Sequence, residues 1–448
     1  MSSQPQATPM DDDGRGWLAK TWAAYSRPSM AAMLLLGFAS GLPLYLVYQK
    51  TSFWLRLEGI ERSTIGFFYW VGLFYSFKFV WAPIIDKIRL PGLGTLGHRR
   101  SWMILSIAGT VAGLSVIATG NPSESLVPIT IGALLLSFSG ATLDISIDAW
   151  RIESAPTDLQ ANMAAAYSFG YRMALIYSGI GFVIADFANW NVSFAVMAIS
   201  MGLTAGLVLL VKEPPRPEGA TIESHDPLAV RIRKIFAEPF IQVWARYGRV
   251  MIPILGLVFI YRLSDFTMGV MASPLYADLG YTPAVVGGIQ SGPGVIATFA
   301  GLFVGGLAAQ QVGLTRSLVL GSALTLVTNG AYAWFAATAS GGDVGLLTLA
   351  VCADNLAGGF VTTVFIAYLS SLVDPANAAT QYALFSSLYA FVNKFLAGYS
   401  GVMADALGYV NFFLVTASYA IPGALLVVVV AYMMKRYPPA PIAGPKET

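Results

Sequence analysis

Charged residues are scarce in this chain of 448 residues. Asp, Glu, Lys and Arg make up 11% of it, whereas hydrophobic residues make up 56%. A soluble domain usually carries about 25% charged residues, and a soluble chain of this length needs more polar residues to cover its surface. The scarcity therefore argues against a soluble protein and indicates that the lipid bilayer is the solvent of most of the chain.

Cysteine and histidine are rarer still. The single cysteine, Cys352, lies in an apolar run, which excludes a disulfide framework and a thiolate metal cluster. The two histidines, His98 and His225, fall in expected loops, so a histidine-based metal or catalytic centre inside the membrane is excluded. A net charge of +2 provides no polybasic face for nucleic acid. We expect no metal and no other cofactor.

A cleavable signal peptide is also missing. Such a peptide needs a short basic region followed by an apolar core. Residues 1–28 are instead polar and contain Asp11, Asp12 and Asp13. We expect this stretch to be a cytoplasmic tail.

Long apolar runs, in contrast, are abundant. A spanning helix needs about 20 mostly apolar residues. The sequence predicts an all-α, polytopic membrane protein with about twelve transmembrane helices in two six-helix halves. The predicted helices lie near residues 30–50, 63–85, 101–119, 126–151, 161–186, 191–211, 250–272, 283–309, 316–339, 344–371, 378–401 and 408–434.

The basic residues set the predicted orientation. Most of the 26 Lys and Arg residues fall in segments that are cytoplasmic if the N-terminus lies inside the cell. Lys50, Arg56 and Arg62 instead fall in segments on the outer side of the membrane. This asymmetry predicts that both termini are cytoplasmic and that the number of helices is even. The predicted parts are a tail over 1–28, a first half over 29–211, a cytoplasmic linker over 212–249, a second half over 250–434 and a tail over 435–448.

The second half repeats features of the first at an offset of about 220 residues. Residues 57–60 and 65–66 correspond to residues 278–281 and 286–287, and Asp186 corresponds to Asp405. The shared order and the nearly constant offset indicate an internal duplication. Parallel six-helix repeats with a binding site between them at the membrane midplane are the architecture of the major facilitator superfamily.

Ionisable residues fall well inside the predicted helices. A charge at mid-bilayer costs at least about 2.5–3.5 kcal/mol, so these residues need a water-filled cavity, partners of opposite charge, or both. As a set they indicate a substrate or ion path, although any one of them can instead belong to a buried ion pair that locks two helices together. The set comprises Lys78, Asp144, Asp148, Arg172, Arg262, Asp265, Asp354 and Lys394.

Helix four carries the clearest polar stripe. Ser137, Gly140, Asp144, Asp148 and Arg151 recur at intervals of three or four residues, which places them on one helical face. Such a stripe faces the protein interior or a cavity. Two aspartates four residues apart repel each other, so Asp144 and Asp148 are candidate proton carriers. Asp148 and Arg151 lie near the predicted cytoplasmic end, where Arg151 is a candidate gate residue.

Helix seven carries Arg262 and Asp265 near its centre, three residues apart. At this spacing they can pair on one face. The pair is either static, or Asp265 takes up a proton when Arg262 turns to the substrate. Asp265 is therefore the foremost coupling candidate.

Further polar residues are candidates for the substrate cavity. Fixed cations facing a cavity suit an anionic substrate group, although Arg172 or Lys394 can instead neutralise a helix-four aspartate. Breaks at residues 41–43 and 292–294, which hold Gly and Pro, are candidate hinges, although Pro43 can equally be a static kink. The cavity candidates are Arg172, Arg262, Asp354, Asn355, Gln381, Asn393, Lys394 and Lys78.

Several motifs resemble the AmpG-type muropeptide permeases of the major facilitator superfamily. The strongest is the helix-four run from Asp144 to Glu153, which includes Asp148, Trp150 and Arg151. The resemblance extends from about residue 30 to residue 430. The other similar stretches are residues 35–43, 75–86, 97–102, 261–265 and 380–388.

The resemblance includes a charged turn between helices two and three. Asp86, Arg99 and Arg100 match the family's signature there, with a longer linker between Asp86 and the two arginines. By resemblance they form a cytoplasmic charge latch between transport states. The alternative is a plain positive-inside anchor.

The resemblance implies a proton-driven permease of the bacterial inner membrane that imports anhydromuropeptides into the cytoplasm. Its partners are then the small-molecule substrate, protons and the lipid bilayer. Similar permeases are linked to acetyl-CoA or siderophores, so another amphiphilic anion is the alternative substrate.

Rival classes are less well supported by the residues. The chain contains no phosphate-binding loop of the kind that ATP-driven pumps need. A membrane-embedded transferase needs an intramembrane histidine or a pair of acids, and Asp144 with Asp148 is the one conceivable pair. We therefore expect a transporter and not an enzyme.

Overall fold

The computed structural model describes residues 26–154, 159–214, 238–373 and 378–439. Within these ranges every regular element is a helix, as predicted. The predicted tails lie mostly outside the described residues. So does the middle of the linker, with His225.

The first half holds the helices α2 to α10. Its first crossing combines α2 (Pro28–Tyr45), η1 (Leu46–Lys50) and α3 (Thr51–Leu57). The second combines α4 (Arg62–Phe68), η2 (Tyr69–Leu73), α5 (Phe74–Phe77), η3 (Lys78–Val80) and α6 (Ala82–Lys87). After the short η4 (Leu93–Leu96) follow α7 (His98–Thr119), α8 (Val127–Ser154), α9 (Gln160–Phe187) and α10 (Trp190–Leu210).

The second half holds the helices α12 to α21. Its first crossing combines α12 (Glu238–Tyr247), η7 (Gly248–Val250), α13 (Met251–Ile260) and α14 (Leu263–Asp278). The second combines α15 (Pro283–Ser291) and α16 (Pro293–Gln311), and α17 (Leu314–Thr338), α18 (Val344–Leu372) and α19 (Ala378–Ala397) follow. The chain ends with α20 (Ser400–Ser418) and α21 (Ala420–Arg436). Gly408, at φ +70°, breaks α20 and separates the last two crossings.

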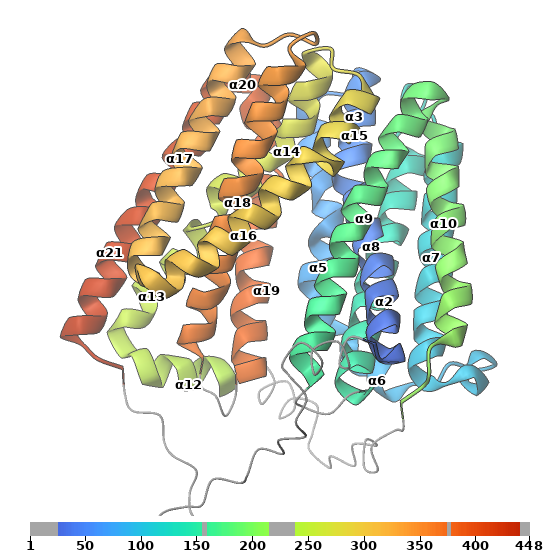
Figure 1. Cartoon of the computed structure of the whole chain (residues 1–448), viewed down its shortest axis with the longest axis horizontal. Coiled ribbons are helices and arrows are strands. Elements are labelled where there is room, and N and C mark those ends of the chain that lie inside the picture. Colours follow the sequence, from blue (N-terminus) through green and yellow to red (C-terminus); the bar gives the residue numbers. More distant parts are fainter. Residues whose placement is uncertain (1–25, 155–158, 215–237, 374–377, 440–448) are drawn as a thin grey trace, which may run out of the picture.

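Ten helical stretches of the described chain are long and apolar enough to cross a membrane. Two further stretches pack alongside these ten: the interrupted segment from α4 to α6 in the first half and the helix α19 in the second. They bring each half to six crossings. The two halves lie side by side (Figure 1). The halves approach each other at the end where α3 is followed by α4, which we call the Arg62 end. They diverge toward the opposite end, where α6 is followed by α7, which we call the Arg99 end.

Glycines allow close packing inside the first half. A methyl group added to Gly37 of α2 would lie 2.2 Å from the carbonyl oxygen of Tyr167, and one added to Gly170 of α9 would lie 1.9 Å from that of Leu34. Small residues let two backbones approach in this way in membrane helices, where packing rather than the hydrophobic effect holds helices together. The α2–α9 contact therefore depends on the missing side chains.

Two expectations about helix irregularities have different outcomes. The predicted break at Gly292-Pro293-Gly294 is confirmed, because α15 ends at Ser291 and α16 begins at Pro293. The predicted break at Gly41-Leu42-Pro43 is wrong, because α2 continues through Pro43. A π-helical turn just after it, over Leu46–Lys50, takes up the distortion instead.

The second crossing and the linker also differ from expectation. Residues 62–87 form a helix interrupted by two 3-10 turns rather than one regular span, and such turns within a helix mark irregular backbone. The predicted linker over 212–249 contains the helix α12. Lys50, which the sequence places at the outer end of the first helix, is fully buried and lies over the Phe194 ring at 5.0 Å.

Candidate transport site

A cavity lies between the two halves. It consists of two adjoining pockets of about 270 and 290 Å³. Both pockets are lined by Tyr45, Gln49, Arg262, Asp265 and Gly269. The shared lining joins them into one space, which we call the central cavity.

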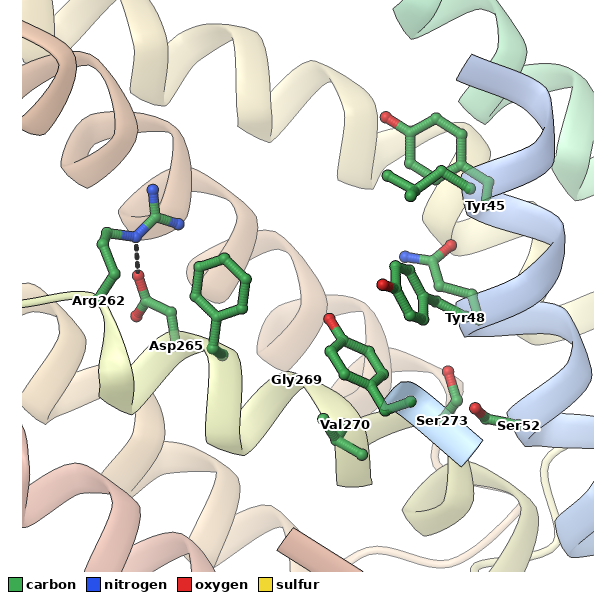
Figure 2. A pocket seen from close by; sticks show the side chains of 12 residues that line it. Tyr45, Tyr48, Ser52, Arg262, Asp265, Gly269, Val270 and Ser273 are labelled. Carbon is green, nitrogen blue, oxygen red and sulfur yellow. Dashed lines mark hydrogen bonds and ion pairs between the residues drawn. The ribbon is translucent and has the colours of Figure 1, made fainter. Parts of the chain in front are cut away.

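The two walls of the central cavity differ in chemistry. Figure 2 shows Tyr45 and Tyr48 on one side and Arg262 with Asp265 on the other. Tyr48 stacks on Tyr69 with ring centroids 4.1 Å apart, so the wall of the first half presents aromatic surface. The wall of the second half presents charge. Such a site suits a substrate that is partly apolar and partly ionic.

The charged wall is built on a break in the seventh crossing. The helix α13 ends at Ile260 and α14 begins at Leu263, so Arg262 sits at the junction. The Arg262 Nε donates to Asp265 Oδ2 over 2.9 Å, which confirms the predicted pairing. Arg262 also donates to Thr362 over 2.9 Å, and Thr325 donates to Asp265 over 3.3 Å. The pair is therefore held from α17 and α18 as well as from its own helix.

Three other predicted cavity residues do line the central cavity: Arg172, Asp354 and Asn355. The Asn355 amide donates to the Gly294 carbonyl over 3.1 Å, which satisfies a backbone group beside the α15–α16 break. The Arg172 guanidinium lies over the Phe299 ring at 5.8 Å. The cavity thus combines one cation of the first half, Arg172, with a cation and two carboxylates of the second half.

The helix-four aspartates form a separate cluster. Asp144 and Asp148 lie 3.5 and 3.8 Å from the Lys78 ammonium, and Asp148 lies 3.6 Å from Arg151. The Ser40 hydroxyl also donates to Asp144. Lys78 of the η3 turn, rather than Arg172 or Lys394, forms the ion pairs with these aspartates that the described residues show. The 3-10 geometry of the second crossing, which sequence reasoning missed, brings it there.

The predicted residues of helix eleven do not line the central cavity. Asn393 is fully buried and its amide donates to the carbonyls of Phe259 and Tyr389 over 3.1 and 2.8 Å. The Lys394 ammonium donates to the Gly72 carbonyl over 3.2 Å. Lys394 therefore bridges the two halves. Gln381 is almost fully buried.

At the Arg99 end, charges gather within the first half. The Arg99 guanidinium, whose side chain is only 8% exposed, lies 2.7 Å from Asp86 and 2.6 Å from Glu153. Arg100 pairs instead with Glu213 at 3.6 Å. Glu213 also accepts hydrogen bonds from the backbone N–H groups of Arg99 and Arg100, over 2.6 and 3.1 Å. It thereby caps the N-terminus of α7, where a negative charge is favourable.

Sequence reasoning missed Glu153 and Glu213 as partners. Glu153 ends the helix-four motif, but nothing in its spacing indicates a contact with α7. Glu213 follows α10 and reaches α7 only through helix packing. We call Asp86, Arg99, Arg100, Glu153 and Glu213 the Arg99 cluster.

We expect Arg99→Lys to destabilise the protein. Lysine cannot contact Asp86 and Glu153 together through one planar fork, and a lost hydrogen bond between charged groups costs about 1.5–3 kcal/mol. The melting temperature in detergent should fall by several degrees. The control is Arg89→Lys, an exposed arginine in the same loop region, which should not change it. Equal melting temperatures for both variants would contradict the role assigned to Arg99.

At the Arg62 end, charges instead join the two halves. Asp278 lies 2.5 Å from Arg56 and 3.1 Å from Arg62, and Arg62 lies 3.8 Å from Asp405. The Tyr409 hydroxyl donates to Asp278 over 2.8 Å. We call these five residues the Arg62 cluster. Sequence reasoning missed it, although Asp278 and Asp405 both stand out in the comparison of the two halves.

Apolar helices in two sets of six, with a charged cavity between them, define a membrane transporter rather than an enzyme. The sequence profile of the Major Facilitator Superfamily matches residues 59–393. The chain belongs to this superfamily and, within it, to the AmpG-type permeases. It is a multi-pass protein of the inner membrane.

Relatives of known name cover nearly the whole chain. The anhydromuropeptide permease of Escherichia coli (strain K12) is 30% identical over 410 residues, which are 90% of this chain and 80% of the relative. The putative transporter AmpG 4 of Rickettsia felis is 30% identical over 399 residues, which are 88% of this chain and 94% of the relative.

Solved structures support the fold. The crystal structure of a bacterial homologue of the human lysosomal transporter Spinster, inward-facing and unoccupied, has a TM-score of 0.66 at 13% identity and covers 96% of this chain and all of that one. The nucleoside transporter NupG has a TM-score of 0.67 at 13% identity and covers 91% of this chain and all of that one.

Proposed function

We propose that this protein imports anhydromuropeptides from the periplasm into the cytoplasm, driven by the proton gradient, by alternating access. The observation that carries the proposal is the central cavity, whose aromatic wall faces a charged wall with an Arg–Asp pair. An anhydromuropeptide carries sugar rings and a charged peptide, which correspond to the two walls. The names of the relatives support the same substrate.

The proposed orientation places the Arg99 end in the cytoplasm with both termini. The excess of Lys and Arg in the segments at that end supports this assignment. The Arg62 end then faces the periplasm. In this orientation the contacts of the Arg62 cluster close the periplasmic side, and the structure corresponds to an inward-facing state.

The proposed coupling step uses the Arg262–Asp265 pair. An anionic substrate group that binds Arg262 competes with Asp265 for the same guanidinium. A proton on Asp265 releases Arg262 to the substrate, and the loss of that proton on the cytoplasmic side restores the pair and weakens substrate binding. Asp144 and Asp148, already paired with Lys78, are the alternative proton carriers.

The test is uptake of labelled anhydromuropeptide into proteoliposomes with and without an inward proton gradient. We expect uptake that exceeds equilibration only when the gradient is present. Uptake that is unchanged when the gradient is collapsed would contradict the coupling. If folded protein shows neither uptake nor exchange, anhydromuropeptide is not the substrate, and acetyl-CoA and siderophores would be tested next.

A further inference from the structure

Two opposite charges in the central cavity stand without an ion-pair partner among the residues that the structure describes. Arg172 comes from α9 of the first half and Asp354 from α18 of the second, and both line the same pocket. A charge inside a membrane-spanning bundle normally finds a partner of opposite sign, as Arg262 and Asp265 do at 2.9 Å. The Arg172 guanidinium lies over the Phe299 ring at 5.8 Å, a contact that does not balance its charge.

The rest of the pocket does not neutralise these two charges. Asn355 uses its amide on the Gly294 carbonyl, and the Thr362 hydroxyl donates to the Gly358 carbonyl over 2.6 Å. Arg262 and Asp265 satisfy each other. The pocket therefore holds a guanidinium from the first half and a carboxylate from the second that form no ion pair with any residue the structure describes.

We propose that Arg172 and Asp354 bind a zwitterionic group of the substrate, with its carboxylate at Arg172 and its ammonium at Asp354. The planar guanidinium matches a carboxylate with two parallel hydrogen bonds, and a carboxylate accepts the hydrogen bonds of an ammonium. This inference rests on the proposed function and names the part of the substrate that the pocket selects. In an anhydromuropeptide that part is a diamino-acid residue whose free end carries an ammonium and a carboxylate.

The placement of the two charges also ties binding to movement. Because Arg172 and Asp354 belong to different halves, a zwitterion that contacts both of them spans the interface between the halves. Its binding energy then depends on how the halves are positioned, and only such a difference can shift a conformational equilibrium. A substrate without one of the two charges contacts one half alone and loses that link.

The experiment compares uptake of three labelled anhydromuropeptides: one with a free diamino-acid end, one amidated at its carboxylate and one acetylated at its amine. We expect wild-type protein to prefer the free form at least about tenfold over each modified form, since each modification removes a charge-assisted interaction. In Arg172→Gln, the preference for the free form over the amidated form should be lost, and part of the preference for the free form over the acetylated form should remain. Asp354→Asn should do the reverse.

The preference is a ratio measured on one preparation, so it does not depend on how much of a variant folds. Arg316→Gln and Asp186→Asn, which replace exposed charges outside the cavity, should keep both preferences. Equal uptake of the three forms by wild-type protein would overturn the inference and leave the proposed function intact. Failure of wild-type protein to take up or exchange any form would overturn the proposed function and, with it, this inference.

Discussion

Replacing Asp265 by Asn will abolish uphill accumulation of anhydromuropeptide and leave exchange across the membrane. Asparagine keeps the shape of the side chain and can still accept from Thr325, but it neither carries nor releases a proton. It also frees Arg262, whose partner at 2.9 Å is then uncharged. A permease that has lost its proton carrier still binds substrate and still alternates between its two states, because neither step then needs a proton.

The size of the effect follows from the loss of the driving force. Accumulation should fall to the level of equilibration, and gradient-driven uptake should fall at least about tenfold, which corresponds to about 1.4 kcal/mol of lost coupling. Two assays on the same proteoliposomes check this: uptake under an inward proton gradient, and exchange of external labelled substrate for internal unlabelled substrate. Retained exchange shows that the variant is folded.

The matched comparison is Asp144→Asn, which changes the other buried acid cluster. Asp144 already lies 3.5 Å from Lys78 and accepts from Ser40, so under the Asp265 assignment gradient-driven uptake should persist in this variant. If Asp144→Asn removes gradient dependence and Asp265→Asn keeps it, the coupling acid lies in the first half and the assignment is wrong.

Neutralising Asp278 will favour the state that is open on the Arg62 side. This carboxylate contacts Arg56, Arg62 and Tyr409 at once, at 2.5, 3.1 and 2.8 Å, and thereby joins the two halves. A partly exposed ion pair contributes up to about 1 kcal/mol. The loss of these ion pairs in Asp278→Asn should therefore shift the conformational equilibrium about fivefold.

Labelling from the Arg62 side measures this shift. Ser52 lines the central cavity and is only 4% exposed, so a cysteine at this position reports when the Arg62 side opens. In a Cys352→Ser background, Ser52→Cys should react about fivefold faster with a membrane-impermeant maleimide when Asp278→Asn is also present. The control is Asp186→Asn, the exposed counterpart of Asp405 in the first half, which should not change the rate. An unchanged rate with Asp278→Asn would show that other contacts hold this side closed.

Local patterns in the sequence determined the class of this protein. The length of the apolar runs predicted the helices, because a bilayer of fixed thickness needs about 20 apolar residues per crossing. The spacing of Arg262 and Asp265 predicted their ion pair, because residues three apart on a helix are neighbours whatever surrounds them. The Gly-Pro-Gly break between α15 and α16 was predicted on equally local grounds.

Contacts between helices were decided only by the tertiary structure. Lys78 rather than Arg172 or Lys394 reaches the helix-four aspartates, because two 3-10 turns set the rotation of the second crossing. Arg99 pairs with Glu153, which lies 54 residues away in the chain, and Asp278 pairs with Arg56, which lies 222 residues away. The tilt and rotation of packed helices bring such residues together, and the spacing of residues along one helix carries no signal of either. The sequence therefore determined which charges lie in the membrane, and the packing of the two halves decided which of them pair with one another.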